Sequence, residues 1–72
     1  MEFKNNLIEL RHEKDLTQKQ LAEKTGLSLS IIRKWETGDR EPSGKALIIL
    51  SKFFEVTTDY LLGLEDKARR AL

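Results

Sequence analysis

Hydrophobic residues recur at helical spacing along nearly the whole chain. In the first segment Phe3, Leu7 and Leu10 lie three or four residues apart, with Ile8 beside them, and polar residues fill the remaining positions. This spacing gathers apolar side chains on one face of an α-helix from about residue 3 to residue 14. No segment alternates apolar and polar residues with period two, so the sequence predicts no β-strand.

A second helix is predicted over residues 17–25 because residues that start and end helices bound it. Thr17 can act as the N-cap, and Gln20 three residues later can complete a capping box. Gly26 follows at the point where the chain needs a residue that tolerates the left-handed conformation. We therefore expect the chain to turn at Gly26.

A third helix is predicted over residues 28–37, and a glycine follows its end. Ser28 or Ser30 can cap its start, while Ile32 and Trp35 have the spacing of an inward face. A tryptophan can also stack on nucleic acid bases. Its helical spacing from Ile32 favours a core position instead.

Two further helices complete the pattern. After a polar loop, Ser43 or Gly44 can open a fourth helix, and Thr57 can cap a short last helix that Gly63 ends. Their predicted inward positions are Leu47, Leu50, Ser51 and Phe54 in the fourth helix, and Tyr60, Leu61 and Leu62 in the last. The sequence thus predicts an all-α fold, a compact bundle of five short helices.

Size and composition indicate one globular domain. The 72 residues are 39% hydrophobic and 35% charged, which is the balance of a soluble globular protein. We expect a domain over residues 1–63 and a charged tail over 64–72, where Leu64, Ala68 and Leu72 are spaced to allow a short helical extension. No apolar run reaches membrane length, no signal peptide is evident and cysteine is absent, so a cytoplasmic location is expected.

Residue types that support catalysis or metal binding do not occur in useful combinations. His12 stands on the polar side of the first helix without a second histidine or a cysteine, so we interpret it as an exposed side chain. No phosphate-binding glycine loop and no nucleophile with a base are present. We expect no enzymatic activity, no cofactor, no metal and no small-molecule ligand.

The second and third predicted helices form a candidate DNA-binding unit. A turn this short leaves no room for the two helices to lie antiparallel, so they must cross steeply as a helix-turn-helix. The outward face of the third helix carries Ser28, Ser30, Arg33, Lys34 and Thr37, all of which can bond bases or phosphates in the major groove. The net charge of only +1 requires that such cations be concentrated on one face.

The run from Thr17 to Ser43, TQKQLAEKTGLSLSIIRKWETGDREPS, resembles the helix-turn-helix core of the Cro/C1-type (Xre-type) repressors of phages and bacteria. The resemblance begins near Leu7 and ends at Asp59-Tyr60-Leu61-Leu62-Gly63. It implies a lambda-repressor-like DNA-binding domain and a transcriptional regulator, most often a repressor, that reads double-stranded DNA with residues 28–37.

The resemblance also implies roles for individual residues. Those at base-contacting positions are Ser28, Leu29, Ser30, Arg33 and Lys34. Those at phosphate-contacting positions are Gln18, Thr37, Arg40, Ser43 and Lys45. Arg11 and Glu36 match a buried or half-buried ion pair that ties the first helix to the third.

The same resemblance implies a weak homodimer on a pseudo-palindromic operator. The residues at its dimer surface are Val56, Thr58, Leu61 and Leu64, although Leu61 could instead belong to the core. Ile49 and Phe53 stand where the family is frequently polar or small, and these apolar residues are either extra core or an addition to this contact surface. The chain departs from the family at Glu55, where glycine is common, so either Glu55 adopts a left-handed conformation or the loop differs.

An alternative is a protein-interaction module of the same fold, such as an antitoxin or anti-repressor. That class tolerates acidic residues on the third helix. Here the corresponding face carries hydroxyl groups and cations, which favours DNA.

Overall fold

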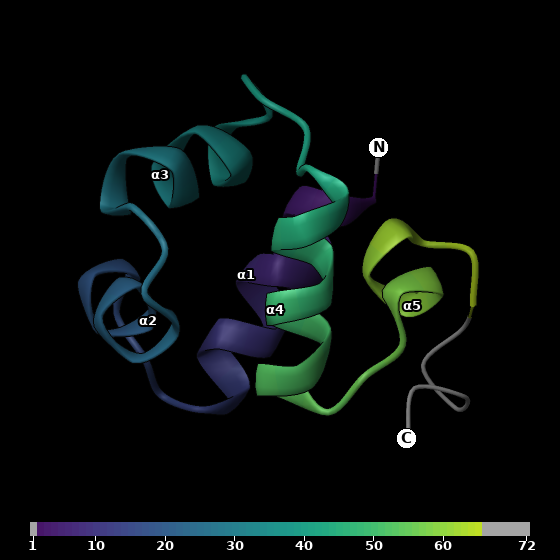
Figure 1. Ribbon diagram of the computed structural model, residues 1–72, viewed down its shortest axis with the longest axis horizontal. Helices are drawn as coiled ribbons and strands as arrows, with labels where there is room; N and C mark the ends of the chain where they lie inside the picture. The colour runs from purple at the N-terminus through teal and green to yellow at the C-terminus, as the bar shows by residue number, and fades with distance from the viewer. Residues whose placement is uncertain (1, 66–72) are drawn as a thin grey trace.

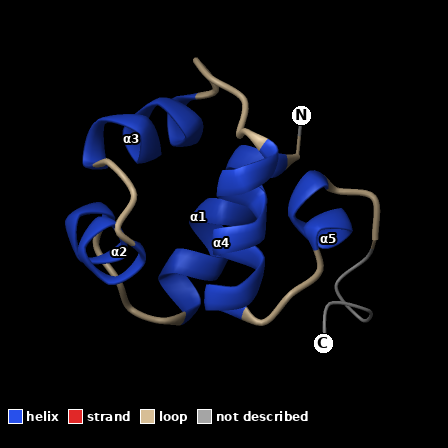
Figure 2. Cartoon of the chain, in the orientation of Figure 1, coloured by secondary structure: helices blue, strands red, loops and turns tan. Residues whose placement is uncertain are grey.

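A computed structural model describes residues 2–65 of the chain, and within that range it contains five α-helices and no β-strand (Figures 1 and 2). The helices are α1 Phe3–Glu13, α2 Gln18–Thr25, α3 Leu29–Thr37, α4 Gly44–Phe54 and α5 Thr58–Leu62. All five predicted helices are present, so the all-α prediction is confirmed. None of them is long and apolar enough to cross a membrane. Ala68 and Leu72, two residues of the predicted tail extension, lie outside the described residues.

Hydroxyl side chains begin four of the five helices. At each N-cap the side-chain oxygen accepts a hydrogen bond from the backbone N–H three residues later, over 3.0 to 3.3 Å. The four N-caps are Thr17, Ser28, Ser43 and Thr57. Of the alternative N-caps predicted from the sequence, Ser28 rather than Ser30 caps α3, and Ser43 rather than Gly44 caps α4. The predicted capping box of α2 also forms, because the side-chain oxygen of Gln20 accepts a hydrogen bond from the Thr17 N–H at 2.9 Å.

The helices meet at a single apolar core. In Figure 1, α2 and α3 lie on one side of α1 and α4, and α5 lies on the other. Leu7, Leu21, Ile32 and Leu50 are fully buried between them. Trp35 is also buried, and its ring meets that of Phe3 edge to face with centroids 5.8 Å apart. The predicted core position of the tryptophan is confirmed.

Glu55, which stands where the family commonly has glycine, ends α4 in the left-handed conformation. Its φ of 58° and ψ of 47° lie in the left-handed region, and its backbone N–H donates to the carbonyl of Ser51. The helix therefore ends as it would with glycine, at a conformational cost of about 1 kcal/mol for a residue with a Cβ. Of the two expectations stated for this position, the left-handed one is correct.

Two residues assigned to a dimer surface lie in the core instead. Val56 and Leu61 are 1% and 0% exposed, because the turn after α4 and the short α5 fold these side chains inward against the other helices. Their assignment to a dimer surface is wrong. For Leu61, the alternative given from the sequence, a position in the core, is correct. Thr58 is half-buried and Leu64 is 71% exposed, so these two stay accessible.

Candidate nucleic-acid interface

The turn between α2 and α3 is three residues long. Gly26 adopts a φ of 76° and ends α2, and Ser28 caps α3 two residues later. α2 and α3 pack against each other, and α3 also contacts α1. The recognition helix expected from the sequence is thus held from one side and lies at the outer edge of the molecule (Figure 1).

One face of α3 is exposed along its whole length. Ser30, Arg33, Lys34 and Thr37 follow the spacing i, i+3, i+4 and i+7 that defines a single helical face, and all four are exposed. The opposite face is buried in the core through Ile32 and Trp35. We call these four exposed residues the α3 stripe. It carries two positive charges and no carboxylate, which is the arrangement that a phosphate-rich groove attracts.

Hydroxyl groups near the α3 stripe are partly engaged within the protein. The oxygen of Ser28 accepts from the Ile31 N–H at 3.3 Å, which leaves its own proton free to donate. The hydroxyl of Thr37 donates to the carbonyl of Lys34 at 3.1 Å, so it must rotate before it can donate to a phosphate. Leu29, at the first turn of α3, is half-buried and offers only apolar contact.

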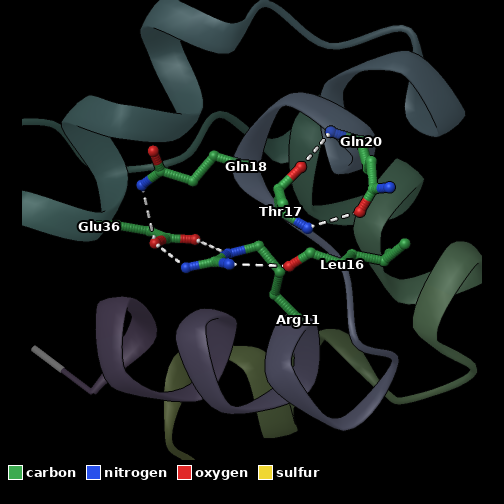
Figure 3. A network of polar contacts seen from close by, with 6 residues as sticks. All are labelled: Arg11, Leu16, Thr17, Gln18, Gln20 and Glu36. Atoms are coloured by element: carbon green, nitrogen blue, oxygen red, sulfur yellow. Dashed lines mark hydrogen bonds and ion pairs between the residues drawn. The ribbon is translucent and has the colours of Figure 1, made fainter.

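An ion pair between Arg11 and Glu36 joins α1 to α3 (Figure 3). Arg11 donates from Nε to one oxygen of Glu36 and from Nη2 to the other, each at 2.8 Å. Its Nη1 donates to the carbonyl of Leu16, also at 2.8 Å. The two side chains are only 11% and 5% exposed, so the structure places them as the resemblance implies, in a nearly buried pair.

The ion pair fixes the charge of Arg11. The side-chain hydrogen bond to Glu36 raises the pKa of Arg11 above its ordinary value, burial opposes this and the negative charge of Glu36 adds to it. Even the ordinary pKa of an arginine lies far above neutrality, so Arg11 is charged near pH 7 in the folded and in the unfolded chain alike. Arg11 therefore contributes no pH dependence near neutrality.

Gln18 belongs to the same network, which sequence analysis missed. Its Nε2 donates to Glu36 Oε1 at 3.0 Å (Figure 3). One of the two amide protons is therefore used inside the protein, and the other remains available to a phosphate. No local pattern signals this bond, because the two residues lie on different helices.

The loop after α3 and the start of α4 hold the other phosphate-contacting candidates. Arg40, Ser43 and Lys45 are all exposed. The Ser43 oxygen accepts from the Ala46 N–H at 3.1 Å, so its part in α4 is that of a cap. Arg40 lies between two exposed carboxylates, Asp39 and Glu41, and the loop therefore has mixed charge.

Lys4 is a further cation beside this loop, and sequence analysis missed it too. Its side chain runs along Gly38, close enough that a Cβ there would lie 3.5 Å from Lys4 Cδ and 3.6 Å from Nζ. Lys4 and Gly38 are 34 positions apart and meet only because α1 packs against α3. The contact places an ammonium group next to the end of the recognition helix.

Comparisons with known proteins agree with this geometry. A family model described as helix-turn-helix matches residues 7–61. The HTH-type transcriptional activator BcrR of Enterococcus faecalis is 48% identical over 66 residues, which are 92% of this chain and 32% of that protein. An uncharacterized HTH-type transcriptional regulator of Bacillus subtilis, YqaE, is 36% identical and matches 97% of this chain and 66% of its own length.

A third relative carries the name of a repressor. The cryptic phage CTXphi transcriptional repressor RstR of Vibrio cholerae is 32% identical over 88% of this chain and 56% of that protein. The chain spans between about one third and two thirds of the length of these three relatives. No solved structure matches the chain.

Proposed function

The chain belongs to the Cro/C1-type helix-turn-helix family, and from that premise we propose that it binds double-stranded DNA sequence-specifically and regulates transcription. The observation that carries the proposal is the α3 stripe, a fully exposed helical face with two cations and two hydroxyl groups. A protruding α-helix fits the major groove of B-form DNA, where each base pair has a distinct pattern of donors and acceptors.

In the proposed complex the residues divide between two tasks. Arg33 and Lys34 donate to base edges, guanine being the preferred partner of both. Ser28, Leu29 and Ser30 contact bases at the start of the helix. Phosphates are held by residues before α3, at its end and after it, namely Gln18, Thr37, Arg40, Ser43 and Lys45. The buried Arg11–Glu36 pair keeps α3 and the Gln18 amide in fixed relation.

A titration by fluorescence anisotropy tests the proposed function. The probe is a labelled duplex from upstream of the gene that encodes the chain, compared with a shuffled duplex of equal length and composition. We expect tighter binding to the upstream duplex, by at least tenfold, and a strong fall in affinity with salt. A protein-interaction module without DNA-binding activity would bind neither duplex at low salt, and equal binding to both would contradict sequence-specific recognition.

We propose repression as the sign of regulation and the cytoplasm as the location. Repression by a DNA-bound domain needs only that it occupy promoter DNA, which the described helices can do without a further contact. The names of the relatives include both an activator and a repressor. A promoter fused to a reporter decides the sign: expression should fall when the chain is supplied, and a rise would contradict repression.

Removal of single phosphate contacts should lower affinity for all DNA sequences equally. We expect Arg40→Ala and Lys45→Ala each to reduce the slope of log affinity against log salt by about 0.9, because each releases one counterion fewer. The measurement is a salt series with the upstream and the shuffled duplex. Lys52→Ala is the matched control, an exposed lysine on α4 that is not assigned to DNA. An unchanged slope would remove the tested residue from the interface.

We also propose that two copies bind a pseudo-palindromic operator as a weak homodimer. One recognition helix reads only a few base pairs, and a twofold axis doubles the contacts if the half-sites are about 34 Å apart. With Val56 and Leu61 in the core, the surface available to this dimer reduces to Thr58 and Leu64, with the half-buried Ile49 and Phe53 as possible additions.

Thr58→Arg tests the proposed dimer. The half-buried Thr58 starts α5, so a cation there would face its own copy across the axis and repel it without entering the core. We expect normal folding, unchanged binding to one half-site, and loss of steep, two-copy binding on the full operator. Lys52→Arg is the control. Two copies bound with undiminished affinity would show that the dimer surface lies elsewhere.

A further inference from the structure

A hollow of about 290 Å³ lies between the start of α1 and the end of α3 with its following loop. The residues that line it come from these segments and are Phe3, Lys4, Thr37, Gly38, Glu41 and Pro42. The hollow therefore borders the α3 stripe at Thr37, the last stripe residue along the chain. Among the described residues that line it, Lys4 is the one cation.

Packing of the neighbouring residue holds Lys4 at this place. Phe3 and Trp35 are buried, and their rings meet edge to face between α1 and α3. The backbone of Lys4, the next residue, is thereby held beside the end of α3. Its exposed side chain runs along Gly38, where a Cβ would lie 3.6 Å from Lys4 Nζ.

The Lys4 ammonium group has no partner within residues 2–65, where it forms neither a hydrogen bond nor an ion pair. Three exposed carboxylates stand near it in the chain or around the hollow, those of Glu2, Asp39 and Glu41. None of them lies within 4.0 Å of the ammonium nitrogen. The net charge of this surface therefore does not select a ligand for Lys4.

The position of the ammonium group indicates its ligand instead. In the proposed complex α3 lies in the major groove, which a phosphate backbone borders on each side. Thr37 and Arg40 are the proposed phosphate contacts at the C-terminal end of α3, and Gly38 lies between them in the chain. An ammonium group that packs on Gly38 is thus next to the backbone that these two residues would hold.

We infer that Lys4 is a further phosphate-binding residue, and that it holds the same stretch of DNA backbone as Thr37. This inference rests on the proposed function, since it adds a residue to that interface. A lysine suits the role because its ammonium group is a compact charge with three donors on a flexible stem. The contact joins α1 directly to the DNA and carries no sequence information, because every nucleotide presents the same phosphate group.

Lys4→Gln tests this contact in a salt series with the upstream and the shuffled duplex. The variant should reduce the slope of log affinity against log salt by about 0.9, and weaken binding to both duplexes by about fivefold at 0.15 M salt. Lys4→Arg retains the charge and should keep the original slope. Lys52→Gln, at an exposed lysine of α4, is the matched control. Circular dichroism melts check that all variants retain the fold.

Cleavage of DNA from a tethered iron chelate tests where Lys4 lies in the complex. The chain contains no cysteine, so Lys4→Cys and Thr37→Cys each supply a single thiol for an iron–EDTA label. The two labelled variants should cut overlapping nucleotides of the upstream duplex. Lys14→Cys is the control, because ten residues of helix place it about 15 Å from Lys4, and it should not cut the same nucleotides.

Failure of this inference can be distinguished from failure of the proposed function. If the original chain binds with a steep salt slope and Lys4→Gln leaves that slope unchanged, Lys4 does not bind phosphate and the proposed function stands. Unequal losses on the two duplexes, or cuts from Lys4→Cys that do not overlap those from Thr37→Cys, would also overturn the inference. If the original chain binds neither duplex, the proposed function fails and this inference fails with it.

Discussion

Glu36→Ala is expected to lower the free energy of unfolding by about 3 kcal/mol. The substitution leaves Arg11 Nε and Nη2 without their acceptors in a nearly buried position, and it removes the partner of the Gln18 amide. Single domains of this size are stabilised by only about 3–5 kcal/mol from the core, so most of the margin disappears. Thermal melts by circular dichroism should show a fall in Tm of about 12–24 °C.

The double variant Arg11→Met with Glu36→Leu distinguishes two contributions to the lost stability. One is the cost of leaving the Arg11 charge buried without a partner, and the other is the loss of the attraction within the ion pair. Replacing a buried ion pair by apolar residues of similar size is often neutral for stability, so we expect the double variant to recover most of the lost Tm. DNA affinity should recover less, because Gln18 still lacks its acceptor. If the Glu36→Ala variant had the same Tm as the original chain, solvent would have to screen this ion pair despite its burial.

Most of the fold could be predicted because its helix boundaries depend on local interactions. Thr17 with Gln20, and Ser43 with the N–H of Ala46, each complete a cap within four residues of sequence. The apolar spacing of Phe3, Leu7 and Leu10 likewise needs no knowledge of partners, and all three are buried. Among the helix starts, only the choices between Ser28 and Ser30 and between Ser43 and Gly44 had to come from the structure.

Less of the candidate site could be predicted from the sequence, because its contacts join segments that are far apart in the chain. Periodicity shows that Arg33 and Lys34 face outward, but it does not bring Lys4 to Gly38 or Gln18 to Glu36. Even the Arg11–Glu36 contact, 25 positions apart, came from a family resemblance rather than from spacing.

Short apolar segments were the second source of error. α5 has only five residues, so its pattern cannot separate a core side chain from one on a dimer surface. Leu61 and Val56 are buried, whereas Leu64 of similar character is 71% exposed. The difference arises where Gly63 ends the helix with a φ of 82° and the chain leaves the core. Tertiary packing decided these positions.

Arg33→Ala is expected to weaken binding to the operator by about 1–3 kcal/mol, a loss of roughly 5- to 150-fold, if the guanidinium reads a base. Arg33 is exposed at the middle of the α3 stripe, and alanine is a better helix former, so the fold should be unaffected. Lys34→Ala should behave in the same way. Lys can donate to the guanine acceptors but lacks the planar fork of Arg, so its loss should be smaller.

The informative quantity is the ratio of affinities for the operator and for a shuffled duplex, measured at one salt concentration. A residue that contacts only phosphate lowers both affinities by the same factor, whereas a base-reading residue lowers the ratio. Arg40→Ala provides the internal comparison, since it should leave the ratio unchanged, and Lys52→Ala should change neither affinity. If Arg33→Ala and Lys34→Ala both preserve the ratio, the α3 stripe holds the DNA backbone and sequence is read by other residues.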